Sequence, residues 1–175
     1  LDGEVIRDSL LSVSGMLDDT MYGKGSLDER SRRRSVYFMI KRSKLIPVMQ
    51  LFDAPEPLVS QGKRMNTTIA PQALMFMNSR NVREYARNLA GELSKNAGDD
   101  LGKAVVRGYE TVLGREPFED ELLATLGFLK VQEGSYAEGK QTNPRLLALT
   151  DFAQTLFGLN EYSYLREYHE RSQLC

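Results

Sequence analysis

Residues that could carry out chemistry gather between positions 53 and 68, around a turn that prolines hold in place. The polar members of this segment are Asp53, Glu56, Lys63, Arg64, Asn66, Thr67 and Thr68. A carboxylate near cationic and hydroxyl groups has the components for acid–base catalysis or for binding a polar ligand. We therefore name Asp53, Arg64, Asn66 and Thr67 as candidate binding residues.

The same segment has a purely structural explanation. Asp53 could cap the turn, Arg64 could pair with it, and Thr67 or Thr68 could cap a helix that begins near Pro71. The spacing matches no catalytic template, and ion-pair networks that only stabilise a fold resemble functional sites. The structural explanation is therefore favoured, and no catalytic residue is assigned.

A second group of candidates is the basic cluster Arg30, Arg32, Arg33 and Arg34. Clustered arginines can bind phosphate, nucleic acid or a carboxylate-rich partner. The acidic residues just upstream, which are available to neutralise them, are Asp18, Asp19, Asp28 and Glu29. We expect the arginines to be solvated or paired within the chain, and we retain Arg33 and Arg34 as candidate binding residues.

The overall charge and a helical hairpin argue against nucleic-acid binding. The 175 residues include 23 basic and 24 acidic side chains, so the net charge is −1 and no global field attracts a polyanion. Residues 109–126 have the pattern of two helices joined by a short turn. The second helix would begin with Glu119, Asp120 and Glu121, where a DNA-reading helix needs hydrogen-bond donors and positive charge.

The sequence lacks the residue patterns that usually bind metal ions, haem or phosphate-bearing cofactors. His169 is the single histidine and Cys175 the single cysteine, which excludes a multi-histidine metal centre and a Cys-x-x-Cys-His haem attachment. A glycine-rich phosphate loop and a Ser–His–Asp arrangement are also missing. We expect no cofactor in this chain. We also expect no membrane span, because no apolar run is long enough.

Hydrophobic periodicity predicts a mainly α-helical fold, a compact multi-helix domain over residues 1–175. We expect a helix and a polar loop over 1–31, an irregular segment over 32–70, a helical part over 71–165 and a tail over 166–175. Residues 35–41 suggest at most a short strand or hairpin, because SVYFMI at 35–40 is rich in β-branched and aromatic residues.

Caps and turn residues place the individual helices. Helices are expected after Asp2, at Val48–Phe52, from Pro71, after Ser79, from Leu101 to Gly114, after Pro117 and around Leu149–Phe157. Loops are expected over Asp18–Ser31 and Gly134–Asn143, because these stretches are polar and contain glycine.

Several segments resemble a known family. RRSVYFMIKRS, LFDAPEP, KRMNTTIAPQALMFMNS, REYARNLA, YETVLGREPFEDEL and DFAQTLFGLNEYSYL are similar to a domain of unknown function at the C-terminal end of large planctomycete proteins. The resemblance covers about Ile6 to Tyr164 and implies that this chain is the latter part of that domain. A helical pattern that begins at the first residues, without Met, agrees with a piece of a longer polypeptide.

The resemblance also implies a context. Parents of this family often carry a cytochrome-c-like module and a second uncharacterised domain upstream, and they are exported, which predicts a periplasmic location. Any haem would belong to the upstream part. The family carries over no activity and no catalytic residue.

Two hypotheses about function follow. The first is a noncatalytic helical module that docks against upstream domains of its parent or against a protein partner. An exposed apolar patch around Phe38 and Met39, or along the first helix, would support it. The second is an enzyme domain acting on a polysaccharide, with its site at Asp53, Arg64 and Thr67, which a concave pocket would support. The sequence leaves the oligomeric state open.

Overall fold

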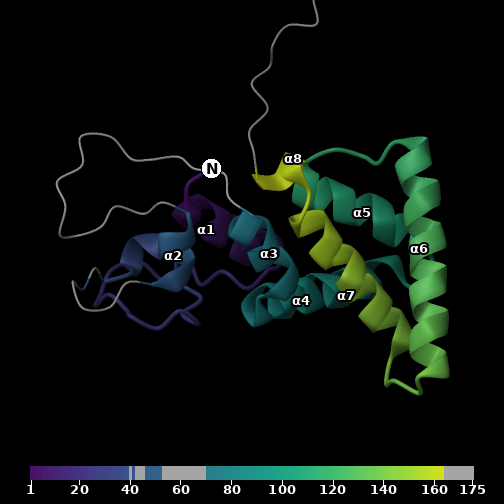
Figure 1. The fold of residues 1–175 in the computed structure, drawn as a ribbon, viewed down its shortest axis with the longest axis horizontal. Coiled ribbons are helices and arrows are strands. Elements are labelled where there is room, and N and C mark those ends of the chain that lie inside the picture. The colour runs from purple at the N-terminus through teal and green to yellow at the C-terminus, as the bar shows by residue number, and fades with distance from the viewer. Residues whose placement is uncertain (40, 42–45, 53–69, 164–175) are drawn as a thin grey trace, which may run out of the picture.

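The computed structural model describes residues 1–39, 41, 46–52 and 70–163, and within them the fold is compact and all-α (Figure 1). The elements are α1 (Gly3–Val13), the 3₁₀-helix η1 (Ser35–Tyr37), α2 (Pro47–Leu51), α3 (Ala70–Asn78), α4 (Arg80–Ala97), α5 (Leu101–Leu113), α6 (Glu119–Glu138), α7 (Pro144–Phe157) and α8 (Asn160–Ser163). The predicted mainly α-helical class is confirmed.

Helix α7 lies at the centre of the packing, because it contacts α4 along one side and α6 along another. Its apolar side chains Phe152, Leu156 and Phe157 are buried. Helix α5 approaches α7 closely at Gly108, where an added Cβ would lie 2.7 Å from the ring of Phe152. Glycine at this position therefore allows the two helices to pack.

The first helix belongs to the same core. Ile6, Leu10 and Leu11 of α1 are buried in one cluster with residues of α4 and α7. The hydroxyl of Ser9 lies 2.8 Å from that of Tyr162, next to the end of the described chain. Residues from both ends of the described sequence thus pack together.

Two predicted capping signals, at Ser79 and Gly114, are confirmed, whereas the Asp2 side chain makes no capping hydrogen bond at the start of α1. The Ser79 side chain accepts a hydrogen bond from the Val82 amide at the start of α4. Gly114 follows α5 in the left-handed conformation, with φ 70°. The predicted apolar face of α4 is also confirmed, because Val82, Tyr85 and Leu89 are buried.

The predicted strand at 35–40 is wrong, because Ser35–Tyr37 forms η1. β-Pairing among the described residues of this region takes the form of isolated bridges, which include Asp18 with Arg33 and Ser26 with Phe38. A single extended segment without a continuous partner gains no ladder of hydrogen bonds. Instead, the carboxylate of Asp8 binds the Ser35 amide at 2.7 Å.

The predicted loop at 134–143 is too long, because α6 continues to Glu138 and only Gly139–Asn143 leaves helical structure. Glycine inside a helix costs up to about 1 kcal/mol relative to alanine. Packing on α7 outweighs that cost here, and the Tyr136 hydroxyl donates to the Asp151 carboxylate of α7 at 2.8 Å. Lys140 and Asn143 then turn the chain with positive φ.

No helix in the described ranges combines the length and the apolarity needed to cross a bilayer.

Candidate functional site

Four of the candidate binding residues, Asp53, Arg64, Asn66 and Thr67, lie outside the described residues. The polysaccharide-site hypothesis therefore stays a prediction. His169 and Cys175 also lie outside this part of the chain. Within it, no group of three or more His, Cys, Asp or Glu side chains is placed to hold a metal ion.

Arg33 organises the loop that precedes it. Its guanidinium lies 3.7 Å from the ring centre of Tyr37 and donates to the carbonyl oxygens of Thr20, Tyr22 and Lys24. The loop over Asp18–Ser31 is thus joined to η1 by one side chain. These four hydrogen bonds engage most of the five guanidinium donors and give Arg33 a structural role. Its candidate role in binding stays a prediction.

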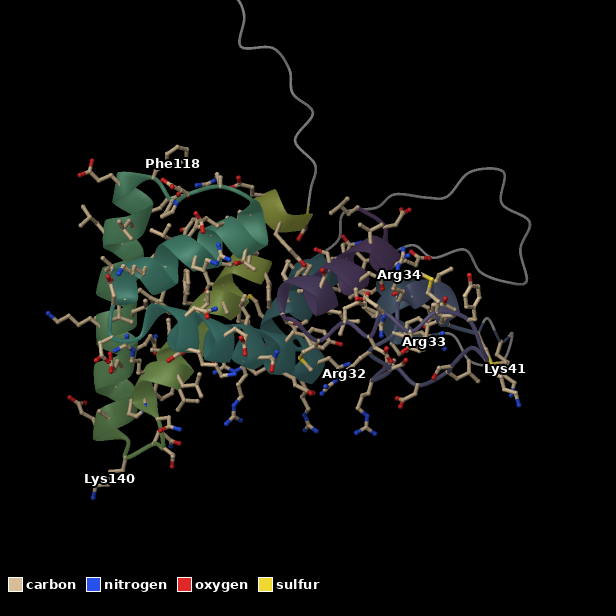
Figure 2. All side chains as sticks on the ribbon, turned by 180° about the vertical axis from the view of Figure 1, so that it is seen from behind. Arg32, Arg33, Arg34, Lys41, Phe118 and Lys140 are labelled. Carbon is tan, nitrogen blue, oxygen red and sulfur yellow. The ribbon has the colours of Figure 1, made fainter. Side chains whose placement is uncertain are left out.

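The neighbouring arginines pair with acids that sequence reasoning did not name. Arg32 lies 3.1 Å from the carboxylate of Glu84 on α4, and Arg34 lies 3.7 Å from that of Asp8 on α1. Both arginines are mostly exposed, so each ion pair contributes little to stability. Figure 2 shows Arg32, Arg33 and Arg34 arising from one short stretch of the chain.

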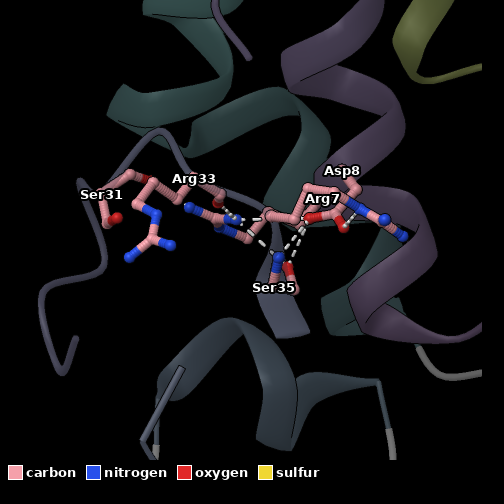
Figure 3. Close-up of polar contacts among 6 residues, drawn as sticks. Arg7, Asp8, Ser31, Arg33 and Ser35 are labelled. Atoms are coloured by element: carbon pink, nitrogen blue, oxygen red, sulfur yellow. Dashed lines mark hydrogen bonds and ion pairs between the residues drawn. The ribbon is translucent and has the colours of Figure 1, made fainter. Parts of the chain in front are cut away.

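A buried network connects α1 to this stretch (Figure 3). Arg7 is only 3% exposed, and its Nη1 donates to the carbonyl of Arg33 at 2.9 Å and to the Ser35 hydroxyl at 3.1 Å. Its Nη2 donates to the carbonyl of Ser31. The Ser35 hydroxyl in turn donates to Asp8 at 2.7 Å. The network therefore fixes residues 31–35 against α1.

The charge of Arg7 is buried but compensated. Burial lowers the pKa of Arg7, while the nearby Tyr85 and Asp8 act in the opposite direction. The Arg7 guanidinium also lies 4.4 Å from the ring centre of Phe38. Sequence reasoning missed Arg7, although it shares a helical face with Gly3, Ile6 and Leu10. A cationic residue within an apolar stripe was the available signal.

A cavity of about 360 Å³ lies beside Arg7, between α1, α2, α3 and α4. The apolar side chains that line it include Ile6, Leu10, Val48, Leu51, Met75 and Val82. Its polar walls are Arg7, Glu29, Ser79, Asn81 and Tyr85. An apolar cavity with a few convergent polar groups has the composition of a ligand site.

Tyr85 is the unusual member of this wall. It is 7% exposed, and burial raises its pKa, while Arg7 acts to lower it. Among the described residues, the Tyr85 hydroxyl has no hydrogen-bond partner. Arg145 Nε is the one fully buried side-chain N or O atom of the described residues that lacks a partner, so the Tyr85 hydroxyl oxygen is not fully buried. It is therefore open to a ligand that enters the cavity.

Two other polar networks are structural. Arg83 on α4 donates to Asp151 at 2.6 Å and to Gln154 at 2.9 Å, which ties α4 to α7. Arg115 donates to Glu121 at 2.7 Å and to Glu161 at 2.8 Å, and these hydrogen bonds raise its pKa. The acidic start of α6 is therefore partly neutralised within the chain.

Exposed apolar side chains occur both where the sequence suggested and on α6. Next to Phe38 in the sequence, Val36 is 72% exposed and Met39 48%, and Val5 on α1 is 48% exposed. Phe38 lies under Arg7 and is half-buried. The largest exposed apolar side chains on and beside α6 are Phe118 (65% exposed), Leu123 (66%) and Val131 (71%). Figure 1 shows α6 at the edge of the molecule farthest from α2, so this face has no described neighbour.

Comparisons with known proteins give a family and no activity. No curated protein and no solved structure matches the chain. A family model described as "PSD1: Protein of unknown function (DUF1553)" matches residues 1–129 of 175, from the start of the chain into α6. The resemblance to a domain of unknown function is confirmed at this level: the chain belongs to the PSD1 (DUF1553) family.

Proposed function

We propose that this chain is a noncatalytic helical accessory module of a large, exported, multidomain protein of planctomycete type. In this proposal it docks onto the upstream domains of that protein, which include a cytochrome-c-like module. The chain itself carries no cofactor, and any haem belongs to the upstream module. The observation that carries the proposal is the outer face of α6.

Helix α6 presents apolar residues on two sides. Leu122, Leu126 and Leu129 pack towards the core, and Leu129 is fully buried. Leu123 and Val131 point away from the core and are exposed. A surface helix of a globular domain normally has one apolar stripe and one polar face, so a second apolar face favours contact with another surface.

The small residues between Leu123 and Val131 suit such a contact. Ala124 and Gly127 are exposed on this side of the helix and would allow a second backbone to approach. The net charge of −1 supplies no strong electrostatic drive, so docking would depend on apolar burial. A cluster of apolar residues at the centre of an interface carries most of its binding energy.

Calorimetric titration of this chain with the separately expressed upstream part of its parent tests the proposal. We expect micromolar or tighter binding, weakened at least tenfold by the double substitution Leu123→Glu and Val131→Glu. The matched control is Val5→Glu with Val36→Glu, which places the same charges at exposed apolar positions far from α6. Absence of binding by the folded chain, or equal loss in both variants, would contradict docking through α6.

Sedimentation velocity of the chain alone tests whether a second copy of the chain covers the α6 face. A dimer that dissociates when Leu123→Glu and Val131→Glu are introduced would show that another copy of this chain, and not the upstream part, covers the face.

The alternative function is an enzyme domain acting on a polysaccharide through Asp53, Arg64 and Thr67. The substitution at Asp53 described in the Discussion tests it.

A further inference from the structure

We propose that the cavity between α1, α2, α3 and α4 binds an uncharged amphipathic small molecule, whose hydrocarbon part fills the cavity and whose polar group accepts a hydrogen bond from Tyr85. This site is separate from the α6 face and does not depend on the docking proposal.

The cavity has the size and the lining for a hydrocarbon group. Its volume of about 360 Å³ lies in the range of roughly 300–1,000 Å³ that is typical of small-molecule sites. The apolar walls come from four helices: Ile6 and Leu10 from α1, Val48 and Leu51 from α2, Met75 from α3 and Val82 from α4. Met75 is a side chain that adapts its shape to a ligand.

The Tyr85 hydroxyl supplies the specific contact. Tyr85 is 7% exposed and lines the cavity. Its hydroxyl makes no hydrogen bond within the described residues, and the oxygen is accessible, since Arg145 Nε is the one fully buried side-chain N or O atom there without a partner. A ligand that offered a hydroxyl, ether or carbonyl oxygen would satisfy this donor. The gain is specific because a pure hydrocarbon of the same size would leave the hydroxyl unpaired.

The charges around the cavity favour an uncharged ligand. The cation of Arg7 is already engaged by Ser31, Arg33 and Ser35 and lies 3.4 Å from Asp8. Glu29 on the wall would repel an anion, and Arg7 would repel a cation. A neutral molecule avoids both penalties.

The cavity continues into a polar groove that could hold a larger head group. Glu29, Pro47 and Asn81 line both the cavity and the groove. The groove adds side chains of both signs, Asp28, Arg30, Arg80 and Glu84. Such a surface offers donors and acceptors to a hydroxylated head group without a net charge preference.

The experiment uses octyl β-glucoside below its micelle concentration as the probe, and follows the ¹³C-methyl signals of methionine in the 175-residue chain by NMR. We expect a saturable shift of the Met75 signal. Glucose alone should produce no shift, since it lacks the hydrocarbon part. Octyl sulfate and octylammonium should bind more weakly than the glucoside.

Two variants locate the contact. Tyr85→Phe removes only the hydroxyl and should raise the dissociation constant at least fivefold, whereas the matched control Tyr109→Phe, in the core between α5 and α7, should leave it unchanged. Val48→Phe narrows the cavity and should abolish the shift, with circular dichroism to verify folding. If Val48→Phe fails to fold, Tyr85→Phe still tests the hydrogen bond by itself.

Three results would overturn the proposal: a Met75 shift that does not saturate, an equal dissociation constant for Tyr85→Phe and the wild type, or tighter binding of octyl sulfate than of the glucoside. The α6 variant with the substitutions Leu123→Glu and Val131→Glu should bind the probe like the wild type. Failure of docking and failure of ligand binding are therefore distinguishable.

Discussion

The hydroxyl groups of Ser9 and Tyr162 lie 2.8 Å apart, although 153 positions separate them in the sequence. This contact joins α1 to α8 at the edge of the aromatic group formed by Phe76, Phe157 and Tyr162. Burial raises the pKa of Tyr162, and the hydrogen bond with Ser9 opposes that shift. The N-terminal helix is therefore part of the bundle.

The substitution Tyr162→Phe tests this contact through the pH dependence of the free energy of unfolding. A tyrosine with a raised pKa in the folded state contributes stability that is complete below its unfolded pKa of about 10, and that is lost as the pH rises above it. We expect the free energy of unfolding in urea to fall above about pH 10, and to fall less steeply in Tyr162→Phe. At pH 7 the variant should lose about 1 kcal/mol, the usual contribution of a hydrogen bond. Identical slopes in the two proteins would contradict a buried, neutral Tyr162.

Arg7→Ala tests the buried network. Removing the cation leaves the carbonyl oxygens of Ser31 and Arg33 without this donor and takes away one of the partners of Asp8, which should lower the free energy of unfolding by about 3 kcal/mol. Arg34→Ala is the matched control, because Arg34 also lies near Asp8 but is mostly exposed, and its loss should cost less than about 1 kcal/mol. If urea unfolding gave equal losses in the free energy of unfolding for both variants, the buried network of Arg7 would contribute no more stability than the exposed ion pair of Arg34.

Gly108→Ala tests the close packing of α5 on α7. The added Cβ would lie 2.7 Å from Phe152, so the variant should lose about 1–3 kcal/mol through overpacking. Gly91→Ala in α4 meets open space and should instead stabilise the chain by up to about 1 kcal/mol, because alanine favours helix. The melting temperature should fall for Gly108→Ala and rise for Gly91→Ala. An unchanged melting temperature for Gly108→Ala would show that α5 and α7 can move apart to accept the added Cβ at no cost in stability.

Asp53→Ala separates the structural from the catalytic hypothesis for the proline-fixed segment. If Asp53 caps the turn or pairs with Arg64, the variant should lose about 1–3 kcal/mol of stability. Chemical denaturation and a screen of polysaccharide hydrolysis, both run on the wild type and on the variant, are the measurements. Unchanged stability together with a lost activity would favour the enzyme hypothesis over the docking module.

Elements with local signals followed directly from the sequence. The start of α4 depends on Ser79, three residues from the amide that it caps, and the end of α5 depends on Gly114. The apolar faces of α4 and α5 follow the 3.6-residue period of a helix, and this period can be recognised in the sequence of each helix alone. The helical class, the caps at Ser79 and Gly114 and the inner faces were predictable because their causes lie within a few residues.

Tertiary structure decided the features that depend on distant partners. Residues 35–40 have strand composition, yet Asp8, 27 positions away from Ser35, holds the start of that segment in a 3₁₀ turn. Helix α6 passes through Gly134 because Tyr136 finds Asp151 on α7. In both cases a hydrogen bond to another helix outweighs a weak local preference.

The candidate cavity, likewise, could not be predicted from the sequence. Tyr85 fits the apolar stripe of α4, and only the packing of α1 and α2 around it leaves its hydroxyl facing a space. The sequence by itself determined the helical class, the caps at Ser79 and Gly114 and the absence of familiar catalytic motifs. The three-dimensional packing decided which polar groups are buried together, because burial depends on neighbours that come from distant parts of the chain.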